Sequence, residues 1–74
     1  MVHLKIKELR EKAGLSQSSL ARSVGITPGA VAQWERGETF PTIPNLDKLA
    51  RVFGCEIADI FGPEEERSVS NAAD

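Results

Sequence analysis

The sequence predicts an all-α domain of five short helices, and three observations support that prediction. Apolar residues recur at intervals of three and four along most of the chain. A glycine, typical of a left-handed helix C-cap, follows four of these stripes: Gly14, Gly25, Gly37 and Gly54. A hydroxyl side chain, typical of an N-cap, precedes three: Ser16, Thr27 and Thr42. We expect no strands and no internal repeat.

The first two helices follow from their apolar spacing. In the first, over about residues 3–13, the inward positions are Ile6, Leu9 and Ala13, and Gly14 ends the helix. Ser16 caps the second helix, which Gly25 ends. Its apolar stripe is Leu20, Ala21 and Val24.

The third helix has the clearest start in the chain. Thr27 is its N-cap, and Pro28 stands at the first helical position, where the missing N–H is no loss. The inward residues are Ala30, Val31 and Trp34, and Gly37 closes the helix. The opposite face then carries Gly29, Ala32, Gln33 and Arg36.

The second half of the chain predicts two more helices. In the loop 38–41, Phe40 is the large apolar group that we expect to anchor the segment to the core. The fourth helix follows Thr42, ends at Gly54 and points Leu46, Leu49, Ala50 and Phe53 inward. A last helical turn carries Ile57, Ile60 and Phe61. This turn begins at Glu56, and we expect it to fray.

Size and composition limit what the chain can be. Seventy-four residues make one domain, which we place at residues 1–62, followed by a disordered polar tail at 63–74. One cysteine and one histidine form neither a disulfide nor a four-ligand zinc site. We therefore expect no metal and no cofactor. Without a signal peptide or an apolar span, the chain is interpreted as soluble and cytoplasmic, with no membrane partner.

Charge is unevenly spread along the chain. The net charge is −2, but residues 1–36 hold six basic and three acidic residues, a balance of +3. Residues 37–74 hold three basic and eight acidic residues, a balance of −5. A local basic surface can steer a nucleic acid even when the total is acidic. Ordinary solvated charge explains the excess equally well.

Residues 17–36 have the spacing of a helix-turn-helix, two short amphipathic helices hinged at Gly25. Two helices that cross steeply need a small side chain at their contact, which Ala21 provides, and a free φ at the turn, which Gly25 provides. A polar face remains once the apolar positions are assigned. Such a pattern also arises by chance in small α proteins.

Residues 9–61 carry a more specific signal. The segments Gly14-Leu-Ser-Gln17, Leu20-Ala21, Gly25-Ile-Thr27, Trp34-Glu-Arg-Gly37 and Pro41 together resemble the phage repressor and Cro-like helix-turn-helix family, also called the xenobiotic-response-element type. The resemblance implies a five-helix, lambda-repressor-like DNA-binding domain. Its third helix would lie in the major groove of double-stranded DNA, usually in a homodimer on a palindromic operator.

The resemblance also assigns roles to matched residues. Gln33 would read a base, Ala32 would meet a thymine methyl, and phosphate contacts would come from Gln17, Thr27, Arg36 and the loop from Thr39 to Thr42. Gly29 either lets the backbone approach DNA or is a plain helix start. Arg10 and Glu35 would form a structural ion pair. The dimer would use Ile57, Ile60 and Phe61, since a short helix is not expected to bury all three.

The function that these residues imply is a sequence-specific transcription regulator, a repressor in its simplest form. The alternative is an antitoxin or another protein-interaction module whose DNA binding serves autoregulation. No catalytic residues are assigned, because the chain has no phosphate loop, no tyrosine and no paired carboxylates on a rigid face. For Trp34 a core position is favoured over base stacking, and Cys55 is interpreted as a small buried hydrophobe. The operator sequence and the regulated genes are not encoded in any pattern of the chain.

Overall fold

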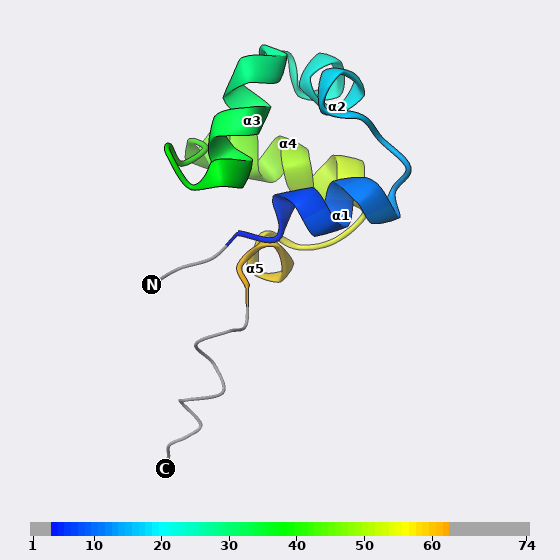
Figure 1. The fold of residues 1–74 in the computed structure, drawn as a ribbon. Helices are drawn as coiled ribbons and strands as arrows, with labels where there is room; N and C mark the ends of the chain where they lie inside the picture. The colour runs from blue at the N-terminus through cyan, green and yellow to red at the C-terminus, as the bar shows by residue number, and fades with distance from the viewer. Residues whose placement is uncertain (1–3, 63–74) are drawn as a thin grey trace.

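A computed structural model describes residues 4–62 of the chain, and in that range it is all-α, as predicted. The helices are α1 (Ile6–Lys12), α2 (Gln17–Val24), α3 (Pro28–Arg36), α4 (Ile43–Phe53) and α5 (Ile57–Ile60). Figure 1 shows α2 at one end of the molecule and α5 at the other, with α1 and α4 between them. The predicted tail, residues 63–74, lies outside the described residues.

The helix ends follow the predicted caps. The hydroxyl oxygen of Ser16 accepts the backbone N–H of Ser19 at 3.0 Å, and Thr27 and Thr42 accept those of Ala30 and Asn45 at 3.1 and 3.3 Å. Each bond satisfies one of the N–H groups that a helix start leaves without a partner. The sequence of cap and stop residues is therefore sufficient to place α2, α3 and α4.

The first helix is shorter than predicted at both ends. Residues 4 and 5 lie outside the helix, because Leu4 forms an isolated bridge with Phe61 and the N–H of Lys5 donates to the carbonyl of Ile60 at 2.7 Å. At the other end the helix stops at Lys12, and Ala13 is the exposed C-cap. The predicted inward position of Ala13 is wrong, because the stripe ends one turn earlier.

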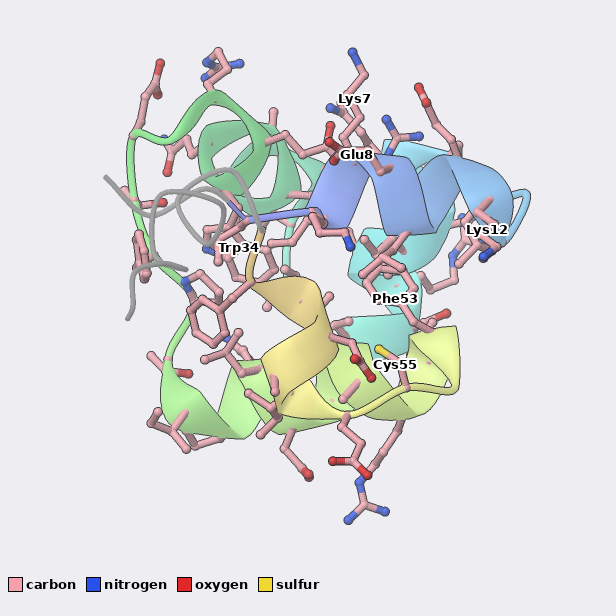
Figure 2. All side chains as sticks on the ribbon, turned by 90° about the horizontal axis from the view of Figure 1, so that it is seen from below. Lys7, Glu8, Lys12, Trp34, Phe53 and Cys55 are labelled. Atoms are coloured by element: carbon pink, nitrogen blue, oxygen red, sulfur yellow. The ribbon has the colours of Figure 1, made fainter. Side chains whose placement is uncertain are left out.

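The core is formed by side chains from all five helices. The buried hydrophobic residues are Ile6, Leu20, Ala21, Val24, Val31, Trp34, Leu46, Leu49, Ala50 and Ile60. Trp34 is 6% exposed, so its predicted core position is confirmed. Figure 2 shows it among the helices, whereas Lys7 and Lys12 point away from the core. Burial of this kind is the main stabilising contribution in so small a domain.

The loop before α4 differs from the prediction. Phe40 was expected to anchor it to the core, but that side chain is 57% exposed. Pro41 is buried instead. Pro41 rather than Phe40 thus takes the inward position in this loop. Ile43, in the first turn of α4, is 71% exposed.

The predicted dimer surface on α5 is wrong at Ile60, which is completely buried. Within this chain α5 packs on α4, and the segment before α1 lies along its end through the Lys5–Ile60 hydrogen bond. Ile57 is half-buried against the same core, and Phe61 is 38% exposed. A short helix can bury more than expected when a neighbouring segment of the chain covers it.

A backbone contact also stabilises the start of α5. The N–H of Glu56 donates to Oδ2 of Asp59 at 3.0 Å. Asp59 stands three residues after the N-cap, where an acidic side chain can reach back to the cap residue. The weak cap expected at Glu56 is thus compensated from within the helix.

Candidate nucleic-acid interface

The helix pair α2 and α3 is joined by a tight turn at Gly25, Ile26 and Thr27. Gly25 has φ of 85°, a left-handed conformation that glycine adopts without a steric penalty. The N–H groups of Gly25 and Ile26 both donate to the carbonyl of Ala21, at 2.8 and 2.9 Å. Ala21 is almost fully buried, so its small side chain lets the helices approach closely.

The two faces of α3 differ sharply in chemistry. Val31 and Trp34 are buried, while Gln33 and Arg36 are exposed. Within the described residues the side-chain amide of Gln33 makes no hydrogen bond, so its donor and acceptor are both available. Ala32 is half-exposed, and its contact with a thymine methyl stays a prediction.

The start of α3 is open to solvent. Pro28 and Gly29 are exposed, and a Cβ atom built on Gly29 would have the hydroxyl of Thr27 as its nearest neighbour, at 3.9 Å. That is an ordinary van der Waals distance. The structure therefore gives no steric reason for a glycine at this position, and its predicted role in close approach to DNA stays a prediction.

Gln17, the expected phosphate ligand, begins α2 and has a partner within the chain. Its Nε2 group donates to Oε1 of Glu35 at 2.9 Å. A primary amide has a second N–H, so the side chain can still donate once more. The hydrogen bond to Glu35 fixes the direction in which that second N–H points. The sequence did not predict this contact, since it depends on how α2 and α3 pack.

Arg10 and Glu35 form an ion pair that is nearly shielded from solvent. The Nε–Oε2 distance is 2.6 Å, and the two side chains are 11% and 6% exposed. A second bond runs from Nη2 to Oε1 at 3.3 Å, and Nη1 donates to the carbonyl of Leu15 at 2.9 Å. The hydrogen bond to Glu35 raises the pKa of Arg10 against the opposing effect of burial. This network ties α1 and the segment before α2 to α3.

The remaining predicted phosphate contacts lie on the surface. Thr27, Thr39 and Thr42 are all exposed, and two of them use the hydroxyl oxygen as a helix cap while the hydroxyl hydrogen stays available. Arg36 ends α3 and binds Glu38 through two hydrogen bonds. The sequence did not predict this pairing, although a carboxylate two residues from an arginine across a glycine was a visible signal.

Other chemistry has little support in the described part of the chain. No group of three or more His, Cys, Asp or Glu side chains in residues 4–62 is placed to hold a metal ion. Burial raises the pKa of the Cys55 thiol, with Asp59 and Glu56 adding to the effect. A raised pKa keeps a thiol protonated and poorly nucleophilic. In the same residues, no helix has the length and apolar character needed to cross a bilayer.

Comparison with known proteins gives a family match across the described domain. A family model described as helix-turn-helix matches residues 6–60, which includes all five helices. The chain belongs to this helix-turn-helix family. Within it, the chain is 39% identical over 62 residues to an HTH-type transcriptional regulator, YgzD of Bacillus subtilis, and the match covers 84% of this chain and 94% of that one. It is also 37% identical over 51 residues to the repressor protein C2 of Salmonella phage P22, a match that covers 69% of this chain and 24% of that one.

Solved structures of helix-turn-helix proteins share the fold. The P22 c2 repressor in complex with a synthetic operator has a TM-score of 0.72 and 34% identity, covering 76% of this chain and 85% of that one. A SinR–SinI protein complex has a TM-score of 0.74 and 27% identity, and the match covers 89% of this chain and 65% of that one. The fold also matches 31% of a longer enzyme chain, the hydroxypropylphosphonic acid epoxidase from S. wedmorenis, with a TM-score of 0.71 and 36% identity over 78% of this chain. The same fold thus occurs in a repressor bound to its operator and as a part of an enzyme.

Proposed function

We propose that this chain is a sequence-specific DNA-binding transcription regulator whose α3 enters the major groove. The observation that carries the proposal is the division of α3 into two faces. Val31 and Trp34 hold the helix on the core, while the Gln33 amide faces solvent without a partner in the described chain. A planar amide can donate and accept at once, which suits the N6 and N7 atoms of adenine.

The contacts to the DNA backbone come from the ends of the two helices. The N-terminus of α2 offers free N–H groups and the second amide N–H of Gln17, which together favour a phosphate. Thr27, Arg36 and the loop from Thr39 to Thr42 extend this line. Because Pro28 and Gly29 have no hydrogen-bonding side chain, few bases are read directly. DNA shape and phosphate spacing then supply much of the specificity.

The regulator acts as a homodimer on a palindromic operator, with recognition helices about 34 Å apart in successive major grooves. Two copies need an apolar contact surface. With Ile60 in the core, the large exposed apolar side chains within residues 4–62 are Phe61, Phe40 and Ile43. Ile57 is half-buried and can contribute at the edge of such a contact.

The regulatory sign that we propose is repression. The relatives include the repressor C2 of phage P22 and the repressor RstR of Vibrio cholerae phage CTXphi, and the latter is 29% identical over 65 residues. A protein bound at an operator can block RNA polymerase without an additional domain. No name among these relatives describes an antitoxin, so the alternative of a toxin partner gains no support.

Selection of bound sites from a random duplex library tests the proposal. The purified full chain should enrich a sequence with two symmetric half-sites, and sedimentation on the enriched DNA should give two protein copies per site. A library that shows no enrichment at low salt would contradict DNA recognition. An enriched site without symmetry, bound by a single copy, would contradict the homodimer alone.

A further inference from the structure

Arg36 and Glu38 form a two-point contact at the end of α3. The guanidinium Nε donates to Oε2 of Glu38 at 2.7 Å, and Nη2 donates to Oε1 at 3.1 Å. Both side chains lie in solvent, 58% and 52% exposed. Two parallel N–H groups facing two oxygens is also the geometry with which arginine binds a phosphate. The carboxylate therefore occupies the edge of Arg36 best suited to the DNA backbone.

The backbone holds Glu38 in this position. Gly37 has φ of 78° and turns the chain back over the helix end. The N–H of Glu38 then donates to the carbonyl of Gln33 at 2.9 Å, and that of Gly37 to Trp34 at 3.1 Å. These bonds are the glycine-dependent C-cap of a helix. As a result, Glu38 stays beside Arg36 through the cap of the recognition helix itself.

We propose that Glu38 is an intramolecular competitor of DNA phosphate for Arg36, which lowers affinity for duplex DNA of every sequence. This inference rests on the proposed function. A phosphate that uses the same edge of Arg36 must displace the carboxylate. A phosphate at the other edge stays close to a second negative charge. The contact also raises the pKa of Arg36 and lowers that of Glu38, so both groups are charged near neutral pH.

The chain contains a matched control for the loss of one negative charge. Arg51 and Asp47 form a second exposed pair, Nε to Oδ2 at 2.9 Å, one turn apart on α4. Glu38→Gln and Asp47→Asn each remove one carboxylate that faces an exposed arginine, and each raises the net charge by one. A general charge effect would be common to both. Competition for Arg36 would be present only in Glu38→Gln.

The test measures the binding of the full chain to a short duplex of random sequence and to an enriched site. Glu38→Gln should tighten binding to the two duplexes by the same factor, roughly two- to fivefold per half-site. Asp47→Asn should change the affinity for either duplex by less. In an Arg36→Gln background, Glu38→Gln should lose most of its gain. An equal gain in the two carboxylate variants, a gain that persists without Arg36, or no gain would each overturn the inference. Failure of the unmodified chain to bind either duplex would instead overturn the proposed function.

Discussion

Gln17 donates its side-chain N–H to the same Glu35 carboxylate that binds Arg10. One buried carboxylate thus joins α1, α2 and α3, and it holds the residue that we expect to reach a DNA phosphate. Structural stability and the proposed phosphate contact are therefore connected through Glu35. A substitution at Arg10 or Glu35 should affect both properties.

Replacement of Arg10 tests the buried ion pair. Arg10→Met leaves Glu35 charged and without its main partner, and should lower the free energy of unfolding by roughly 3–5 kcal/mol. Urea denaturation of the purified chain measures the change. Arg51→Met, which breaks the exposed pair with Asp47, should cost less than about 0.5 kcal/mol. Equal effects of the two variants would show that the Arg10–Glu35 pair has no special structural role.

Gln17→Ala should weaken binding to all DNA sequences by a similar factor, because a phosphate contact carries no sequence information. It should also destabilise the fold by roughly 1–3 kcal/mol, since the hydrogen bond to a charged partner is lost. Binding isotherms on an enriched site and on random duplex give the first quantity, and urea denaturation gives the second. A change in sequence preference in this variant would assign Gln17 to base recognition instead.

Gln33→Ala should change sequence preference and leave the stability of the fold nearly unchanged, the reverse of Gln17→Ala. The Gln33 side chain is exposed, so stability should change by no more than about 0.5 kcal/mol. Preference should relax at one position of each half-site, by roughly 1–3 kcal/mol. Competition binding with single-base variants of the enriched site measures this. If every position keeps its preference, another residue of α3 reads the DNA.

Ile60→Ala and Ile43→Ser distinguish the core from the proposed dimer surface. Ile60 is fully buried, so its truncation should cost roughly 2–5 kcal/mol of stability. Ile43 is mostly exposed, and its replacement should leave the urea midpoint nearly unchanged while weakening the dimer in sedimentation equilibrium. An Ile43→Ser chain that dimerises as well as the unmodified one would remove Ile43 from the interface.

The Arg36–Glu38 contact predicts a pH dependence. Its hydrogen bond lowers the pKa of Glu38 below the ordinary value. A carboxylate with a lowered pKa stabilises the fold above its unfolded pKa, near 4.3, and that contribution is lost as the pH falls through the folded pKa. A pH titration followed by carbon-detected NMR should give a Glu38 pKa below the ordinary value for glutamate. Arg36→Gln should raise that pKa toward the ordinary value. Arg51→Gln should leave it in place; equal shifts in the two variants would contradict a specific contact.

The sequence predicts the helices well because their signals are local. Caps at Thr27 and Thr42, glycine stops and apolar stripes act within one or two turns, so each can be interpreted without knowing the fold. The expected burial of Phe40 and exposure of Ile60 were both wrong. In the loop before α4 the neighbouring Pro41 takes the inward position. The burial of Ile60 depends on residues distant in sequence, since Leu4 and Lys5 lie against the end of α5.

The candidate site is predictable in part. The outward positions of Gln33 and Arg36 follow from helical periodicity once Trp34 is placed inside. The partners of Gln17 and Arg36 do not, because one depends on the packing of α2 on α3 and the other on the turn at Gly37. Side-chain pairing of this kind requires the three-dimensional structure.

The open space around Gly29 has a consequence for how this protein can change. A Cβ atom added there lies 3.9 Å from the hydroxyl of Thr27, an ordinary contact, and Gly29 is not in the left-handed conformation that disfavours other residues. The position is exposed and outside the core, so in the proposed complex with DNA a substitution there can alter the contact while the fold stays intact. Under the proposed function, the domain can therefore vary its DNA contacts through a single codon.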